Sequence, residues 1–390
     1  MTVLRHRLAL AGFVLAVVAS LALQEQAPGA AELARAIDQL GSLDSYEIRM
    51  EAARTIRRAP AEQAAPALTR AAREHRDEYV RYRAAVLLSG FSQPSTGTLM
   101  RALLADRNDR LRTVAAAWFE HHPDLQVLPA LIEALTDETS EFVRPALTRA
   151  LAAHGDDPRA RDVLVPLVSR GEDYFRGAVI EALGDYRGQY ALSAIEAVAR
   201  LDGPLQDDAV AAIGKMGEAS RLRLLVDLQR KVPDVGQPTL SASLCLLGLN
   251  CDAHKTYIVD TLKFAAAAED RQALLRGAVH GAEMLARAGH DDMLAALYEV
   301  GVSAGPSAQA PIALGVGLVA LRDTSATLRV LAKRADRDAA LLLLRDAFDM
   351  LNEDFEEERF FVEVRKAYWA AGAGSPERQV AEDLIRVLEF

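Results

Sequence analysis

Apolar residues recur along this chain with two periods, one inside short segments and one between them. Inside segments they return every three or four residues, which predicts amphipathic helices, most clearly over residues 127–135. On the longer scale, an apolar residue followed by Arg returns after 32, 31, 32 and 32 residues. The five pairs are Ile48-Arg49, Val80-Arg81, Leu111-Arg112, Val143-Arg144 and Phe175-Arg176. A period of this length predicts an array of repeated structural units.

Each repeated unit predicts a helical hairpin. Further apolar residues follow four and eight positions after each apolar anchor, which gives the second helix one continuous buried face. An acidic turn precedes most pairs, and an earlier amphipathic segment precedes that turn. Glycines end several units, and we expect left-handed helix caps at Gly155, Gly184 and Gly214. Because a lone hairpin cannot bury its core, the pattern predicts an all-α superhelix of stacked antiparallel hairpins, an α-solenoid.

The repeat pattern also divides the chain. We expect a signal peptide over residues 1–22, a short linker over 23–30 and a repeat array over 31–290. Beyond residue 290 the helices look longer and the register fades, which predicts divergent helical repeats and a C-terminal cap over 291–390.

The acidic turn, the apolar–Arg pair and the Leu-Gly ending together resemble the HEAT repeat. The likeness is strongest to the bacterial variety named after phycobilisome lyases, and residues 128–155 match it best. The resemblance implies an armadillo-type solenoid whose second helices line a concave groove. It implies no particular function, because such arrays serve many unrelated roles.

The repeated arginines lie about 100° from their apolar anchors on a helical wheel, inside the apolar arc. A charge at such a position is costly unless it is paired. Carboxylates in the preceding turns are the natural partners, and we expect a ladder of ion pairs that fixes each turn and joins neighbouring repeats. The ladder comprises Arg49, Arg81, Arg112, Arg144, Arg176, Asp77, Asp109, Glu141 and Asp173.

The opposite face of the second helices is the candidate binding surface. Aromatic and Arg side chains are enriched at protein interfaces, and this face carries several of them. The groove candidates are Arg54, Arg58, Tyr82, Arg83 and Arg149. The alternative is that they are ordinary surface residues.

Composition and charge narrow the function. The net charge is −10 and no basic excess gathers in one segment, which argues against a nucleic-acid partner. The acidic run over residues 352–358 is interpreted as a solvated helix start, because acidic side chains favour helix N-termini.

The N-terminus has the pattern of a targeting segment. Arg5 and Arg7 precede an uncharged run over residues 8–23, and the small residues Ser20 and Ala22 predict cleavage close to Ala22. We therefore expect export to a periplasm or to the cell exterior. The alternative is an uncleaved membrane anchor formed by residues 8–23, although a bilayer span needs about 20 residues.

The two cysteines, Cys245 and Cys251, are a candidate disulfide. Cys245 falls near the end of a predicted helix that Gly248 stops, so the chain folds back and brings the α-carbons within the roughly 4.4–6.8 Å that a disulfide needs. An oxidising compartment would preserve the bond. The alternative is that Cys245 is a small buried residue and Cys251 a loop thiol.

Catalytic motifs are missing from the sequence. Residues 90–94 lack the second Gly of a nucleophile elbow, and neither His280 with Glu283 nor His290 has a metal-site spacing. We expect no catalytic residues, no metal and no cofactor. The leading hypothesis is a non-catalytic scaffold or adaptor that binds a protein partner through its groove in an exported compartment. The alternatives are a lyase-like HEAT-repeat enzyme and a membrane-tethered assembly factor.

Overall fold

The computed structural model describes residues 28–42, 45–91, 93–351 and 354–390. This part of the chain forms 22 α-helices and four short 3-10 helices and contains no strand, so the all-α prediction is confirmed. No helix within it is long and apolar enough to cross a membrane. The predicted signal peptide and residues 23–27 of the predicted linker lie outside the described residues.

The helices form eleven successive hairpins. These are α2 (Ala30–Gln39) and α3 (Tyr46–Arg58), α4 (Ala61–Glu74) and α5 (Glu78–Ser89), α6 (Pro94–Leu103) and α7 (Asp109–His121), α8 (Leu128–Asp137) and α9 (Val143–Ala153), α10 (Pro158–Leu167) and α11 (Asp173–Asp185), α12 (Leu192–Ala199) and α13 (Gln206–Met216), α14 (Leu222–Leu228) and α15 (Gln237–Leu246), α16 (Cys251–Ala266) and α17 (Gln272–Arg287), α18 (Asp291–Ser303) and α19 (Pro306–Arg322), α20 (Thr324–Ala332) and α21 (Arg337–Leu351), and α22 (Asp354–Ala370) and α23 (Pro376–Leu388). The 3-10 helices are η1 (Gln189–Ala191), η2 (Ala219–Arg221), η3 (Asp234–Gly236) and η4 (Glu269–Arg271).

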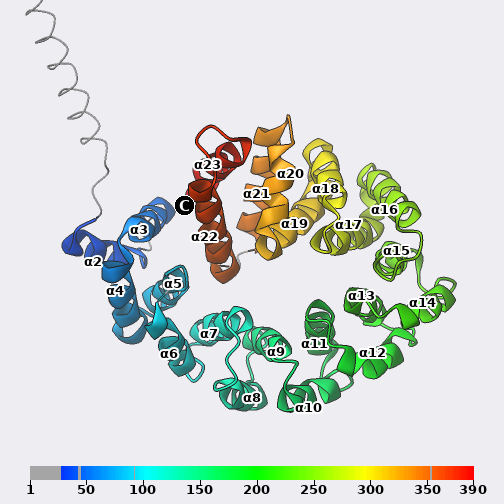
Figure 1. The fold of residues 1–390 in the computed structure, drawn as a ribbon, viewed down its shortest axis with the longest axis horizontal. Helices are drawn as coiled ribbons and strands as arrows, with labels where there is room; N and C mark the ends of the chain where they lie inside the picture. Colours follow the sequence, from blue (N-terminus) through cyan, green and yellow to red (C-terminus); the bar gives the residue numbers. More distant parts are fainter. Residues whose placement is uncertain (1–27, 43–44, 92, 352–353) are drawn as a thin grey trace, which may run out of the picture.

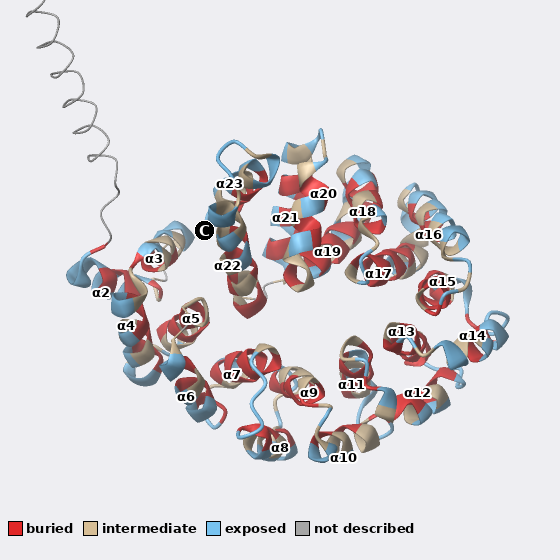
Figure 2. Ribbon diagram, in the orientation of Figure 1, coloured by how far each residue is buried: buried red, intermediate tan, exposed pale blue. Residues whose placement is uncertain are grey.

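The hairpins stack side by side and curl into an oval ring (Figure 1). The second helices from α5 to α17 line the inside of the ring, and their first helices lie outside. The curl brings α22 and α23 back beside α3 and α5, so the two ends of the array meet. Figure 2 shows the buried residues concentrated where the two layers of helices face each other.

The buried positions follow the predicted period. All five residues four positions after an anchor, and all five residues eight positions after it, are buried. Four of the five anchors are buried as well. Ile48 is the exception, with 39% of its surface exposed, so its prediction as a core anchor is wrong. In the described chain only α2 precedes α3, so no earlier hairpin covers that side of the array, and α3 instead buries Ala52, Ala53 and Ile56.

The prediction of left-handed glycine caps is wrong, because two of these glycines lie inside helices at close contacts between helices. Gly155, Gly184 and Gly214 are not among the glycines with positive φ, and left-handed turns occur at Gly217 and Gly248 instead. Gly184 and Gly214 lie within the inner helices α11 and α13. A Cβ atom on Gly184 would lie 2.8 Å from a backbone atom of the next inner helix, and one on Gly214 would lie 2.6 Å from such an atom. These glycines therefore let consecutive inner helices approach closely.

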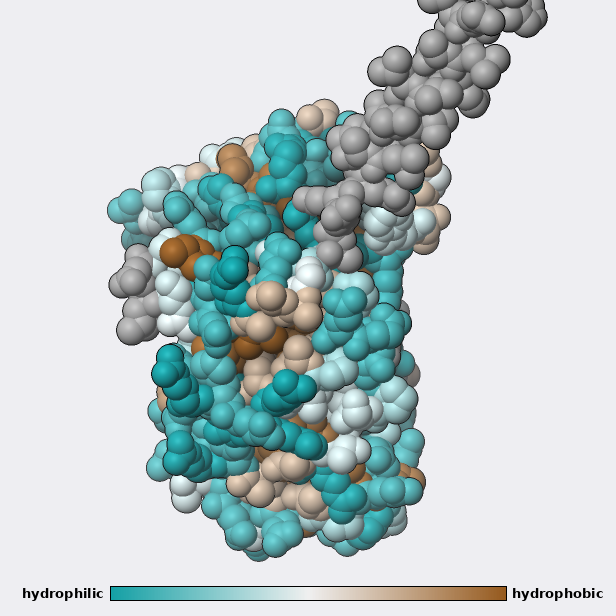
Figure 3. Space-filling model, turned by 90° about the vertical axis from the view of Figure 1, so that its left-hand side faces the viewer, coloured by the Kyte–Doolittle hydropathy of each residue, from teal (hydrophilic) through white to brown (hydrophobic). Residues whose placement is uncertain are grey.

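One side of the ring is largely hydrophilic (Figure 3). Figure 3 shows the side of the ring that lies on the left in Figure 1, where polar residues dominate and apolar ones are exposed in a narrow band. This distribution is ordinary for a protein in water, and the more unusual chemistry lies inside the ring.

Candidate functional site

Three of the five repeated arginines join neighbouring hairpins, through partners that the sequence pattern did not indicate. Arg81 pairs with Asp106, and Arg112 Nε lies 2.7 Å from Glu138 Oε2. Both carboxylates belong to the turn before the next second helix. Arg144 reaches the next hairpin differently, with its guanidinium carbon 3.6 Å from the centroid of the Phe175 ring.

Three of the four predicted carboxylate partners have other roles. Asp77 accepts hydrogen bonds from the backbone nitrogens at the start of α5, at 2.8 and 3.3 Å, and so caps that helix. Asp109 accepts a bond of 3.5 Å from the hydroxyl of Ser140, and Glu141 is exposed. Asp173 alone pairs as predicted, 2.8 Å from Arg176. Short carboxylates next to a helix start cap it readily, which removes them from the ladder.

The ladder is also incomplete at its beginning. Arg49 donates a hydrogen bond of 2.7 Å to the backbone oxygen of Ser42, so a carbonyl takes the place of the expected carboxylate. The guanidinium of Arg49 also lies 5.7 Å from the Tyr46 ring centroid.

Most of the groove candidates are engaged by the chain's own C-terminal helices. The hydroxyl of Tyr82 donates a bond of 2.5 Å to Asp354 Oδ2, and Arg83 pairs with the same carboxylate. Arg54 Nη1 lies 3.5 Å from Glu389 Oε2. Their interpretation as a free surface is therefore wrong, because the curl of the array places α22 and α23 over this face. Arg58 is exposed at the end of α3.

We call the contact of α22 and α23 with α3 and α5 the seam. At its centre, Arg57 Nη2 lies 2.7 Å from Glu358 Oε2, and their side chains are only 4% and 1% exposed. Arg57 also lies 5.0 Å from the Phe361 ring centroid. Phe355 of α22 packs into the hydrophobic core of the N-terminal hairpins. The described part of the acidic run, residues 354–358, does begin a helix, α22, but Glu356 and Glu358 are buried there, so its interpretation as solvated is wrong. We call the buried pair of Glu358 with Arg57 the clasp.

A polar cluster continues from the seam across the inside of the ring. Glu120 of α7 is 3% exposed and accepts bonds of 2.9 Å from Arg149, Arg322 and Tyr186. Burial by itself would raise the pKa of Glu120, but the two guanidinium groups lower it below its ordinary value. Since Arg322 belongs to α19, this contact joins hairpins 202 residues apart.

A second part of the cluster centres on Asp185 of α11. Its carboxylate lies 3.1 Å from Arg149, 2.9 Å from Lys215 and 2.8 Å from Arg287, which belongs to α17. These cations overcome the burial that would raise the pKa of Asp185 and hold it far below its usual range. Arg287 also pairs with Glu283 at 2.9 Å.

Glu283 in turn faces His280, with 3.3 Å between His280 Nδ1 and Glu283 Oε2. Burial would raise the pKa of Glu283, but its contacts with His280 and Arg287 lower it to about 2. Burial would lower the pKa of His280, and the bond to Glu283 raises it instead. Glu120 and Asp185 are therefore held as anions by cations from other hairpins, whereas Glu283 is held by His280 and Arg287 of its own helix.

Three residues at one end of the polar cluster are of the types that bind metal ions. Glu120, His121 and Glu356 offer two carboxylates and an imidazole within 4.8 Å of one another. Arginines already neutralise both carboxylates, since Arg322 contacts each of them and Arg359 lies 2.5 Å from Glu356. A metal ion would add positive charge where cations already compensate the anions, so this corner fits a structural role better.

A different set of residues is exposed at the N-terminal ends of the inner helices. In four of the five repeats the position directly before the anchor holds an aromatic residue or Arg, and we call the row of Tyr79, Arg110, Phe142 and Tyr174 the rim. Tyr79 is half-buried and the other three are exposed. Phe142 is 70% exposed and Tyr174 is 64% exposed. An open cavity of about 540 Å³ lies at the rim and is lined in part by Tyr79 and Arg110. The sequence repeat already places an aromatic residue or Arg directly before four of the anchors. The groove candidates come from the opposite face of the second helices and so do not include these residues.

Comparison with known proteins identifies the repeats. A model of HEAT repeats matches residues 33–120, 98–184 and 128–214. No curated protein matches the chain. Among solved structures, YibA of E. coli has 18% identity and a TM-score of 0.41, covering 55% of this chain and 81% of its own.

Two further solved structures are similar in fold. The complex of CpcE and CpcF of phycocyanin lyase from Nostoc sp. PCC7120 has 18% identity and a TM-score of 0.39, covering 66% of this chain and 96% of that one. Kap95p, in a structure that concerns RanGDP, has 13% identity and a TM-score of 0.40, covering 92% of this chain and 57% of its own.

Proposed function

Because this chain is a HEAT-repeat protein, we propose that it is a non-catalytic adaptor that binds a protein partner in an exported compartment. The observation that carries the proposal is the rim, a row of aromatic and Arg side chains at equivalent positions of successive hairpins, three of them exposed and one half-buried. Large aromatic residues and Arg supply most of the binding energy at protein interfaces. A row that repeats with the hairpins is suited to a partner that lies along several of them.

The rim also indicates the chemistry of the partner. Neighbouring helices pack about 8–10 Å apart, so the step from Tyr79 to Tyr174 spans roughly 30 Å, the length of about nine residues of extended chain. Carboxylates alternate with the aromatic side chains, as at Glu78, Asp109 and Glu141. We propose that the partner presents an extended segment with apolar and basic side chains.

The inside of the ring supports a non-catalytic role. Catalysis needs groups that are free to act on a substrate. The carboxylates of Glu120 and Asp185 are fixed by cations from distant hairpins, and the carboxylate of Glu283 is fixed by Arg287 of its own helix. We therefore propose that the inner cluster holds the ring closed while the rim binds.

The test is a comparative pulldown with purified full-length chain as bait. The double variant Phe142→Ser with Tyr174→Ser removes the two most exposed rim aromatics. The matched control is Tyr257→Ser with Phe264→Ser on the outer helix α16, where these side chains are 41% and 55% exposed. We expect a partner that wild type and the control retain and the rim variant loses. A partner that all three retain would exclude the rim, and no specific partner for wild type would contradict the adaptor proposal.

Export is a separate part of the proposal. It rests on the uncharged run over residues 8–23 and the small residues Ser20 and Ala22 near its end. N-terminal sequencing of the protein from the exported fraction should find a start close to Ala22. A chain that still begins at Met1 and sediments with membranes would instead favour a tethered assembly factor.

A further inference from the structure

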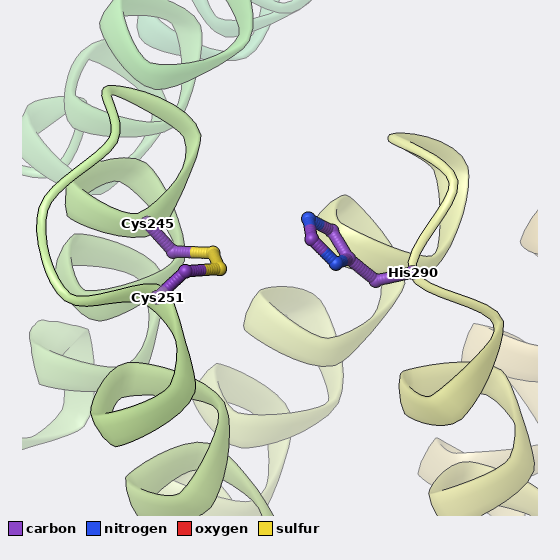
Figure 4. Close-up of side chains that lie close together, drawn as sticks. All are labelled: Cys245, Cys251 and His290. Atoms are coloured by element: carbon purple, nitrogen blue, oxygen red, sulfur yellow. A yellow bond between two sulfur atoms is a disulfide. The ribbon is translucent and has the colours of Figure 1, made fainter.

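The two cysteines and His290 form a cluster apart from the seam and the rim. Figure 4 shows the sulfur atoms of Cys245 and Cys251, bonded as a disulfide, on the side that faces the imidazole of His290. Their α-carbons are 4.2 Å apart. One ligand atom from each of the three residues lies within 4.8 Å of the other two.

Backbone turns hold these residues in place. The nitrogen of Gly248 donates to Cys245 and that of Leu249 donates to Leu244, a pattern that ends α15 with a left-handed glycine. Cys251 is then the first residue of α16. The same pair of bonds, from Gly289 to Ala286 and from His290 to Leu285, ends α17. His290 is thereby fixed between α17 and α18, so the cluster needs no mobile segment to assemble.

The environment of the three side chains favours binding over a purely structural role. Cys245 is 5% exposed, whereas Cys251 and His290 are half-buried and open to small solutes. The N-terminus of α16 favours negative charge on the Cys251 sulfur. Among the described residues, the imidazole of His290 makes no side-chain hydrogen bond. Its ring nitrogens are therefore available, and one of them lies within 4.8 Å of both sulfur atoms.

We propose that the reduced form of this cluster binds one Zn²⁺ ion through Cys245, Cys251 and His290. Two thiolates and an imidazole are the ligands that Zn²⁺ prefers, and a three-ligand site leaves a position for water. A dithiol or phosphine reductant supplies two electrons and the disulfide takes up two protons, which yields two thiols. The ion then displaces both thiol protons as it binds. In the disulfide the sulfur atoms are bonded to each other and hold no ion.

The site would therefore report the redox state of its surroundings. A two-electron oxidant such as a small-molecule disulfide takes two electrons from the thiolates and two protons from solvent, becomes two thiols, and leaves the protein disulfide, which releases the ion. Reduction makes binding possible again. In an oxidising compartment the disulfide form persists, whereas a reducing one favours the metal-bound form.

The test is a metal titration of the full chain in both redox states. The protein is reduced with a phosphine, stripped with a chelator and titrated with Co²⁺ under anaerobic conditions, followed by displacement with Zn²⁺. We expect one Co²⁺ per chain with a thiolate-to-cobalt charge-transfer band, and loss of that band when Zn²⁺ is added. The oxidised protein, identical in sequence and folded, should bind no Co²⁺ with this signature.

Two single variants separate the ligands from their neighbours. His290→Ala should weaken Co²⁺ binding at least tenfold, because even residues that only orient metal ligands contribute about tenfold or more. His254→Ala is the control, since His254 lies one turn after Cys251 but outside the three-residue group. Equal affinities for wild type and His290→Ala, a signature shared by the oxidised protein, or no stoichiometric binding after reduction would each overturn the proposal.

Discussion

Neutralising Glu358 should open the seam. Glu358 and Arg57 are 301 residues apart in sequence, and their contact ties α22 to α3. At 2.7 Å and an effective dielectric constant of about 20, the gross attraction is about 6 kcal/mol. Desolvation of both ions offsets most of that attraction. The variant Glu358→Gln removes the charge, keeps the shape and leaves Arg57 buried without a counter-ion.

Breaking a buried ion pair by removing one partner costs about 3–5 kcal/mol. We expect about 3 kcal/mol for Glu358→Gln, because Arg365, which also contacts Glu358, is 27% exposed and can turn towards solvent. The free energy of unfolding is measured by urea denaturation followed by circular dichroism. Hydrogen exchange should be faster in α22, α23 and α3, since an array loses its end contacts first.

The matched control is the exposed ion pair between Arg329 and Asp291 on the outer helices, where the side chains are 49% and 28% exposed. Arg329→Met should cost less than about 1 kcal/mol, because solvent screens such pairs. The double variant Arg57→Met with Glu358→Leu should recover most of the lost stability, since apolar side chains replace a buried pair well. Equal costs for Glu358→Gln and Arg329→Met, with unchanged exchange in α22, would refute the buried clasp.

Three further predictions concern other parts of the ring. Arg144→Ala should lower the free energy of unfolding, measured by urea denaturation, by about 1 kcal/mol. This is the scale of a partly buried contact between a cation and an aromatic ring, here Phe175. A loss near about 4 kcal/mol would indicate an ion pair instead. Gly214→Ala should destabilise the protein by about 1–3 kcal/mol, because the added methyl group would meet α15. Gly97→Ala is the control: its methyl group would meet no atom within 4 Å, so it should stabilise α6 by up to about 1 kcal/mol. A change of the same sign in the free energy of unfolding of both variants would contradict the close approach. The pKa of Glu283 in the folded protein is about 2, below its ordinary value of 4.5. Its contribution to the free energy of unfolding is therefore complete above pH 4.5 and is lost as the pH falls towards 2. The melting temperature should drop over that pH window, and it should drop less steeply in Glu283→Gln.

The helices and hairpins could be predicted from the sequence because they depend on the spacing of apolar residues over short distances along the chain. The spacing of Val80, Ala84 and Leu88 places one buried face on α5, and the same arithmetic holds for the inner helices that follow it. HEAT repeats match residues in this region, and the fold prediction is confirmed. The prediction failed for Ile48, which lies in the first described hairpin, where the described residues include no earlier hairpin to cover it.

The closure of the ring could not be predicted in this way. The partners of Arg57 and Glu120 are Glu358 and Arg322, more than 200 residues away, and no short-range period relates them. Their meeting depends on the summed curl of all hairpins between them. For the same reason the acidic run around Glu356 resembled an ordinary solvated helix start until its surroundings were known.

The close approaches at Gly184 and Gly214 bring α11, α13 and α15 together on the inside of the ring, where the array curves. In an open solenoid the number of repeats is free, because adding or deleting one changes only the length. Here the turn per hairpin and the number of hairpins must together bring Glu358 to Arg57. Deleting one internal hairpin would leave every local interface intact and still separate the clasp. In a closed ring the number of hairpins is therefore fixed by the structure. Point substitutions can weaken the contact that closes the ring, but only the deletion of a whole hairpin changes that number.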